Sequence, residues 1–192
     1  MRASISVDPW GCIFGALLLL LVPLRWLLAA VLAAILHECF HILAIRLCGN
    51  QILSIHIGLG GTTIETDVSG GTQELLCAMA GPFGSLLLLT LCHRFPELAL
   101  CAGTQGLFNL LPVYPLDGGR ALGCLLTMLF PGKADRVGKW VARAVFLLLT
   151  VIGIYGAVRL SLGLLPIFLT SFLAFKVILR KKPCKPRQIR VQ

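Results

Sequence analysis

Apolar runs as long as a membrane-crossing helix follow one another along almost the whole chain, and they restrict its fold more than any other feature. A helix needs about 20 mostly apolar residues to cross the hydrocarbon core of a bilayer. With 57% hydrophobic and 13% charged residues among 192, little sequence is left for a soluble domain. We therefore predict an all-α polytopic membrane protein with about six transmembrane helices, at about 10–23, 26–48, 75–93, 98–130, 140–157 and 162–179.

The fourth apolar run is too long for one crossing and contains several helix breakers. Pro112, Pro115 and the pair Gly118-Gly119 lie within it. Because proline and glycine interrupt helices, we expect a helix, an irregular stretch at about 109–117 and a second helix over about 118–130. Irregular backbone at membrane depth is tolerated only where protein or a water-filled cavity covers it. The break should therefore lie inside the protein.

The loop after the second run has the alternation of β-strands. Apolar and polar residues alternate on both sides of Gly60-Gly61. This pattern predicts a short β-hairpin with a glycine turn. Residues 52–68 are also a candidate exposed edge for a substrate strand, with Ile57 and Leu59 as its test positions.

The distribution of Lys and Arg predicts the orientation. With cytoplasmic termini, the inner side carries the basic residues near 133–143 and from Lys176 onward, and the outer side carries only Arg25, Arg94 and Arg159. We expect a single transmembrane domain at 1–180 and a basic cytoplasmic tail at 181–192. The chain has a net charge of +9, and six of its basic residues lie from Arg180 onward, which favours a topology anchor over a nucleic-acid partner. The eight cysteines show no C-x-x-C spacing and are expected to be packing residues.

The segment His37-Glu38-Cys39-Phe40-His41 places three ionisable groups inside an apolar run. On a helix, His37 and His41 share a face and can bind one metal ion, and Glu38 can reach a water molecule there as a general base. The alternative is a packed polar pair between helices. Buried charge without a partner is costly, which favours the metal site.

Two histidines leave a zinc site incomplete, because catalytic zinc usually has three protein ligands and an open fourth position. Asp117 is the acidic residue that lies well inside another apolar run, so we expect it to complete a site for one Zn²⁺ per chain. The alternative for Asp117 is a cap for a helix beginning at Gly118, and the two roles are compatible. Arg120 could pair with Asp117 or reach the interface. Four other polar residues are expected to be solvated or interfacial: His56, His93, Glu65 and Asp67.

His37-Glu38-x-x-His41, followed by Asn109, Pro112 and the run Pro115-Leu116-Asp117-Gly118-Gly119, resembles the site-2 protease family of intramembrane zinc metalloproteases. The Gly81-Pro82-Phe83 element is also similar to that family's core. The order of elements, including the glycine hairpin, is most similar to the stage IV sporulation FB-type branch. The resemblance covers residues 8 to about 180 and implies a metalloendopeptidase. It also implies that Asn109 orients the substrate or donates to the oxyanion; satisfying freed backbone near the prolines is the alternative.

The resemblance implies a membrane-associated protein substrate, such as a sigma-factor precursor, that is cut to release a cytoplasmic regulator. The bacterial cell membrane or the membrane around the forespore would be its location. The sequence does not determine whether the protein has inhibitory membrane partners or forms a homo-oligomer. The chain departs from many relatives at Ser85, where they carry asparagine, and ATP-linked regulation through a C-terminal CBS domain is not carried over.

Two other functional classes compete with a protease. A membrane zinc-binding or zinc-transport protein would use the same ligands, but transport calls for further polar sites or repeat symmetry, which the sequence does not show. An inactive scaffold is disfavoured because the motif is intact. Glu38 separates the classes, since hydrolysis needs it and zinc binding does not.

Overall fold

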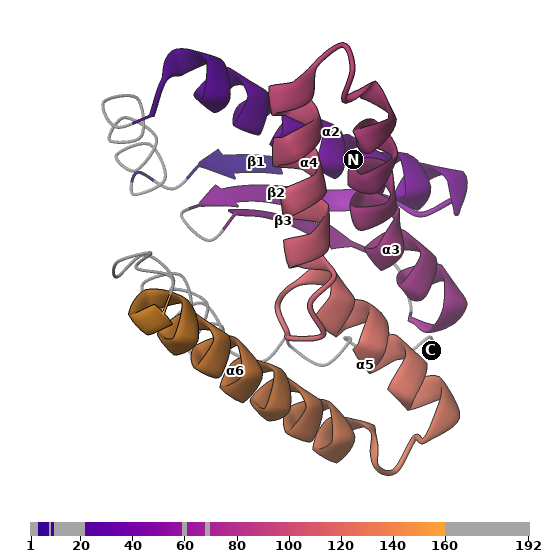
Figure 1. The fold of residues 1–192 in the computed structure, drawn as a ribbon. Coiled ribbons are helices and arrows are strands. Elements are labelled where there is room, and N and C mark those ends of the chain that lie inside the picture. The colour runs from indigo at the N-terminus through magenta and orange to yellow at the C-terminus, as the bar shows by residue number, and fades with distance from the viewer. Residues whose placement is uncertain (1–3, 8, 10–21, 59–60, 68–69, 160–192) are drawn as a thin grey trace.

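The computed structural model describes residues 4–7, 9, 22–58, 61–67 and 70–159 (Figure 1). The described part is mostly helical and has a small sheet. Its elements are β1 (Ser4–Val7), α2 (Leu24–Leu47), β2 (Ile52–Gly58), β3 (Gly61–Thr66), α3 (Gly71–Leu87), the 3₁₀ helix η1 (Leu88–Leu91), α4 (Pro96–Asn109), α5 (Asp117–Leu129) and α6 (Ala134–Arg159).

Three stretches of helix in the described part are long and apolar enough to cross a membrane. They are Leu24–Leu47, Gly71–Leu91 and Ala134–Ala157, which match the second, third and fifth predicted spans. The predicted spans at about 10–23 and 162–179 lie almost entirely outside the described residues, as does the tail at 181–192. The total of six spans therefore stays a prediction.

The α2 helix buries its two histidines and exposes most of its large apolar side chains. Ala33, His37, His41 and Ile45 are buried and recur every four residues, so they form one face. Large apolar side chains such as Leu28 are exposed on the other faces. This arrangement suits a helix surrounded by lipid, where only the face toward neighbouring helices can hold polar groups at acceptable cost.

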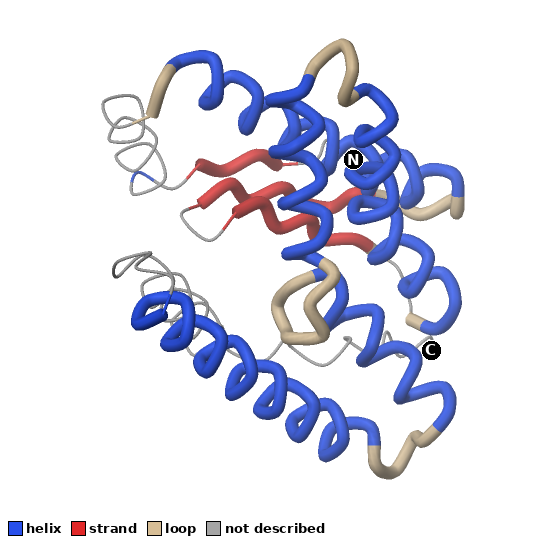
Figure 2. The backbone as a smooth tube through the Cα atoms, in the orientation of Figure 1, coloured by secondary structure: helices blue, strands red, loops and turns tan. Residues whose placement is uncertain are grey.

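The fourth predicted span is broken as the sequence indicated. The α4 helix ends at Asn109, α5 begins at Asp117, and residues 110–116 form the loop between them (Figure 2). A Cβ at Gly118 would lie 2.1 Å from the Leu110 carbonyl oxygen, so only glycine lets the start of α5 lie against this loop. The alternative role of Asp117 as a helix cap is not observed: the helix starts at Asp117 itself, and its N-cap residue, Leu116, has no side-chain capping hydrogen bond.

The hairpin is confirmed, but it belongs to a three-stranded sheet of order β1-β2-β3. The β2 and β3 strands pair antiparallel, while β1 pairs parallel with β2. The prediction of a substrate edge at Ile57 is wrong, because β2 is the central strand and has a neighbour on both sides. Leu59 lies outside the described residues. In the hairpin, β3 is the strand at the edge of the sheet.

The helices form a connected bundle around α3. The α2, α3 and α4 helices pack on one another, α5 packs on α3, and α6 packs on α5 (Figure 1). Small residues lie at these contacts, including Ala33, Ala78 and Ala102, all buried. Small side chains let membrane helices approach closely. This packing brings the break between α4 and α5 to the polar face of α2.

Candidate metal centre

Three donor atoms from two helices converge inside the bundle. The Nε2 atoms of His37 and His41 are 3.2 Å apart, one turn from each other on α2. The Oδ2 atom of Asp117, the first residue of α5, lies 3.1 Å from Nε2 of His37 and 3.2 Å from Nε2 of His41. Both histidines are buried and Asp117 is half-buried. The structure thus brings together the residues that the sequence predicted as metal ligands.

The spacing of these atoms fits a zinc ion. Zinc binds histidine nitrogen and carboxylate oxygen at about 2.0–2.2 Å in a tetrahedron, whose ligand atoms are then about 3.3 Å apart. The three separations here, 3.1, 3.2 and 3.2 Å, are close to that value. Two nitrogens and one carboxylate oxygen are also a typical donor set for catalytic zinc. The residues could therefore hold zinc and leave one position open.

Hydrogen bonds behind the rings orient both histidines. Nδ1 of His41 lies 2.7 Å from the backbone carbonyl oxygen of Cys77 on α3. A carbonyl only accepts, so this nitrogen carries the proton and Nε2 keeps its lone pair for a metal. Nδ1 of His37 lies 2.7 Å from Oγ of Ser85, which is fully buried. The same tautomer, with Nδ1–H donating to Ser85, directs Nε2 of His37 toward Asp117.

Ser85 is a positioning residue that sequence reasoning missed. The sequence singled it out only as a departure from relatives, because a small residue in an apolar helix is usually a packing residue. Its position on α3, one turn beyond Gly81, was the available signal. The structure shows that a hydroxyl there meets the hydrogen-bonding need of a buried imidazole.

Gly81 lets α3 pass directly over the ring of His41. A Cβ at Gly81 would lie 2.1 Å from Nε2 of His41, which is the donor atom itself. A Cβ at Gly84 would lie 2.0 Å from Cδ2 of Phe40. Both glycines are therefore required by close approach to α2, and Gly81 belongs to the Gly-Pro element found in the sequence.

Glu38 lies beside the donor group, as a general base would. Its carboxylate is close enough to both histidines, to Asp117 and to the side chain of Thr62 on β3 for electrostatic interaction. The predicted base therefore faces the sheet as well as the donor atoms. An extended segment lying along β3 would pass close to this carboxylate.

Asn109 also reaches the donor group. Its Nδ2 lies 3.2 Å from Nε2 of His37. Asn109 is the last residue of α4, so the ends of two helices meet at His37. Within the described part of the chain its amide contacts this ring and not a backbone carbonyl of the break.

The other polar residues lie away from the donor group. His56 is exposed in the sheet, where it hydrogen-bonds with Ser6 and, at 3.1 Å, with Ser54. His93, Glu65 and Asp67 are exposed, as expected. Among the described residues, the ion pairs of Asp117 are with histidines, and none is with Arg120.

A helix-borne His-Glu-x-x-His motif and a carboxylate from a broken helix thus meet inside an apolar bundle. In comparisons with known proteins no family model matches the chain, but individual relatives do. The chain is 30% identical over 149 residues to stage IV sporulation protein FB of Bacillus subtilis, covering 70% of the chain and 52% of that protein. It is 31% identical over 144 residues to Rip3 of Mycobacterium tuberculosis, named as a zinc metalloprotease, covering 62% of the chain and 36% of Rip3.

The fold is that of a solved membrane protease. The site-2 protease from Methanocaldococcus jannaschii superposes with a TM-score of 0.70 at 20% identity, over 98% of this chain and 96% of the other. The chain is thus similar in sequence to stage IV sporulation protein FB and Rip3, and it has the fold of a site-2 protease. The chain spans about half the length of stage IV sporulation protein FB and about a third of Rip3.

Proposed function

We propose that the protein is an intramembrane zinc metalloprotease that hydrolyses peptide bonds in or near the membrane segments of a protein substrate. The observation that carries this proposal is the convergence of His37, His41 and Asp117 with Glu38 beside them. The name of the relative Rip3, a zinc metalloprotease, and the fold of a site-2 protease support the same class of enzyme. The residues present fit zinc by donor type and by spacing.

The residues of the site divide the work of hydrolysis. Zinc held by His37, His41 and Asp117 would supply Lewis-acid polarisation of the scissile carbonyl and activation of a water molecule. The Glu38 carboxylate would accept a proton from the attacking water and deliver it to the leaving amine. The amide of Asn109 donates to the oxygen on which negative charge develops. Ser85 and the Cys77 carbonyl hold the two imidazoles in the tautomer that leaves Nε2 free.

A substrate strand would pair with the edge of β3. A peptide bond in a membrane helix is shielded, since its polar groups are already hydrogen-bonded, so the substrate must unwind before it is cut. An unwound segment can add to a sheet edge through backbone hydrogen bonds. The contact between Thr62 and Glu38 would then bring the segment to the base.

Proline substitutions on β3 test this pairing. Neighbouring amides of a strand point to opposite sides, so one of Thr63→Pro and Ile64→Pro removes an outward donor and spares the ladder to β2. That variant is expected to keep zinc and to lose about five-fold in cleavage rate, which corresponds to one net backbone hydrogen bond of about 1 kcal/mol. Wild-type cleavage rates in both variants would rule out pairing at β3.

The resemblance to the sporulation branch supports a membrane-associated sigma-factor precursor as substrate, with release of a cytoplasmic regulator. A cytoplasmic position for both termini, and the cell membrane or the membrane around the forespore as the location, belong to the same proposal. The competing function is zinc binding or transport without proteolysis. In the part of the chain that the structure describes, the donor group around His37 is the one cluster suited to a metal, which favours hydrolysis over a transport pathway.

Replacing Glu38 with glutamine tests the function directly. The variant keeps the size and hydrogen-bonding ability of the side chain but cannot take up a proton. With a single-span sigma-factor precursor in the same membrane, we expect cleavage to fall at least about 100-fold, the usual contribution of general base catalysis. Product mass and zinc content per chain are measured together, and zinc content should stay at the wild-type value.

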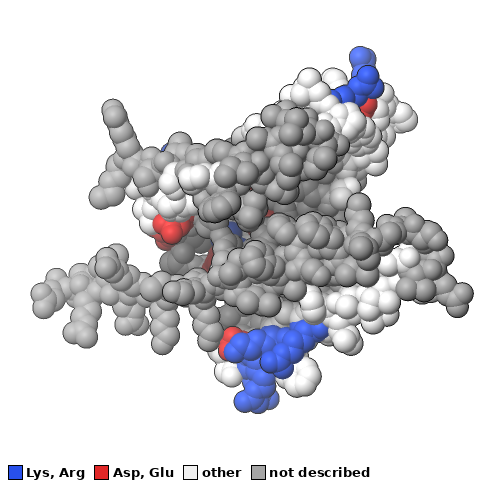
Figure 3. Space-filling view, turned by 90° about the vertical axis from the view of Figure 1, so that its left-hand side faces the viewer, with Lys and Arg blue, Asp and Glu red and all other residues white. Residues whose placement is uncertain are grey.

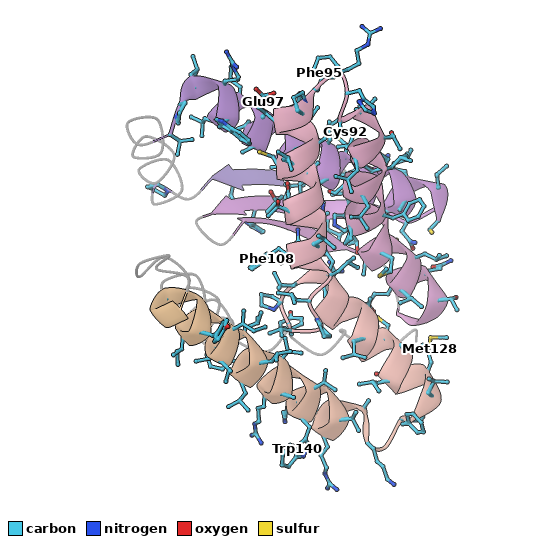
Figure 4. The ribbon with its side chains drawn as sticks, in the orientation of Figure 1. Cys92, Phe95, Glu97, Phe108, Met128 and Trp140 are labelled. Atoms are coloured by element: carbon cyan, nitrogen blue, oxygen red, sulfur yellow. The ribbon has the colours of Figure 1, made fainter. Side chains whose placement is uncertain are left out.

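Glu97→Gln is the matched control, because Glu97 lies at the far end of α4 and pairs with Arg25 at 3.5 Å (Figure 4). An exposed pair of this kind contributes little to stability, so this variant should cleave like the wild type. Equal cleavage by the Glu38→Gln variant would contradict the mechanism. Zinc in every variant with no product from any of them would favour the zinc-binding alternative for this substrate.

A further inference from the structure

The first turns of α6 carry a basic face that takes no part in the metal centre. Asp135, Arg136, Lys139, Trp140 and Arg143 line a shallow hollow with a volume of about 260 Å³. Their spacing of three and four residues places them on one side of the helix. Figure 3 shows Lys and Arg side chains gathered on this face, with an acidic group beside them.

The hollow keeps a net positive charge. Nζ of Lys139 lies 2.6 Å from Oδ2 of Asp135, one helical turn away. The guanidinium of Arg143 lies 5.7 Å from the centre of the Trp140 ring, within range of a cation–π interaction. The hollow contains one carboxylate, that of Asp135, and three cations, those of Arg136, Lys139 and Arg143. Its net charge is therefore positive and attracts an anion. Guanidinium groups are also well suited to phosphate, which they bind with two parallel hydrogen bonds.

This hollow lies at one end of an apolar helix. The stretch Ala134–Ala157 is long and apolar enough to cross a membrane. Beyond Arg143 the exposed side chains are apolar, including Leu147, Leu148 and Val151. Trp140 is 64% exposed at the boundary between the two parts (Figure 4). Tryptophan and basic residues at the end of a span lie at the level of the lipid headgroups.

We propose that this hollow binds the headgroup of an anionic phospholipid, with its phosphate between Arg136, Lys139 and Arg143. The acyl chains lie along the exposed apolar side chains that follow on the same helix. That apolar surface is what favours a lipid over an acidic peptide, which would cover the cations but not the leucines. The headgroup of phosphatidylcholine carries its own cation and would gain less from the hollow.

Trp140 can report binding from within the hollow. The full-length protein with Trp10→Phe and Trp26→Phe keeps Trp140 as its only tryptophan. It is reconstituted in phosphatidylcholine vesicles that contain either brominated phosphatidylglycerol or brominated phosphatidylcholine at equal density. We expect at least two-fold stronger quenching of Trp140 by the anionic lipid, and this preference should weaken in high salt because charges at an exposed surface are screened.

A double variant, Arg136→Gln with Arg143→Gln, is expected to lose the preference. Lys133→Gln with Arg94→Gln removes the same number of charges outside the hollow and should retain it. Mass spectrometry of the lipids that copurify with the protein, with all tryptophans in place, repeats the comparison without the Phe substitutions. Zinc content verifies that each variant is folded.

Equal quenching by both brominated lipids would overturn the proposal. So would the same loss in both double variants, since this would indicate a general charge effect. Competition by inorganic phosphate or by a polyglutamate peptide as effectively as by phosphatidylglycerol would assign the hollow to a soluble anion or an acidic partner and also overturn it.

Discussion

Replacing Gly81 with alanine is expected to abolish zinc binding while the protein stays folded in the membrane. The added Cβ would lie 2.1 Å from Nε2 and 2.6 Å from Cε1 of His41, so it would take the place of the donor atom. His41 would have to turn away and give up its hydrogen bond to the Cys77 carbonyl. Alanine is about 1 kcal/mol more favourable than glycine in a helix, so α3 itself should not suffer. Zinc per chain, measured by mass spectrometry of the purified protein, and substrate cleavage should both fall to background.

Gly123→Ala is the control for this substitution. Gly123 lies on α5, the same helix as Asp117, and a Cβ there has no heavy atom within 4 Å. Zinc content and cleavage should equal those of the wild type. One zinc per chain in the Gly81→Ala variant would mean that α3 does not pass over His41 as closely as the structure has it.

Asp117→Asn should weaken zinc binding by more than the roughly 10–100-fold that outer-shell substitutions cost, since it changes a ligand itself. Asparagine has the same shape, and its amide can donate to the unprotonated Nε2 atoms, which lie 3.1 and 3.2 Å from Oδ2 of Asp117. It lacks the negative charge that attracts a divalent ion, and its amide oxygen is a weaker ligand. The fold should therefore be retained while affinity is lost. Competition with a chromogenic zinc chelator measures the change in the dissociation constant.

Asp67→Asn makes the same chemical change in the loop after β3. Oδ1 of Asp67 accepts a hydrogen bond from the backbone N–H of Gln51 at 2.7 Å, and an amide oxygen can do the same. This variant should bind zinc like the wild type. If the Asp117→Asn variant bound zinc equally well, Asp117 would be a neighbour of the site and not a ligand.

The parts of the site that could be predicted are those where residues unusual in a membrane-spanning helix occur within an apolar run. His37, Glu38, His41 and Asp117 are ionisable residues in apolar runs, and their burial is costly unless another group satisfies them. The prolines and glycines of 109–117 mark the break for a similar reason, because they interrupt a helix. The alternation around Gly60-Gly61 identified the hairpin, since strands repeat every two residues.

The parts that could not be predicted depend on contacts between distant segments. Ser85 contacts His37 across 48 positions, and a single serine in an apolar helix carries no sign of its partner. The β1 strand has four residues, too few for a readable alternation, and it pairs with residues 50 positions further on. Without β1, the central strand of the sheet was taken for an edge. The sequence could not decide against the alternative of a cap at Asp117, because the exact first residue of a helix is uncertain by a residue or two.

Residues 110–116 form a loop whose length the chain is not free to change. Loops usually accept inserted or deleted residues, because nothing depends on the distance between the elements that they join. Here Asn109 ends one helix, Asp117 begins the next, and both side chains reach Nε2 of His37. Metal sites tolerate distance errors of only about 0.2 Å. An extra residue inserted at 110–116 would separate these two helix ends, whereas the turn between η1 and α4 could accept one. Related sequences are therefore expected to differ in length at 92–95 and to agree in length at 110–116.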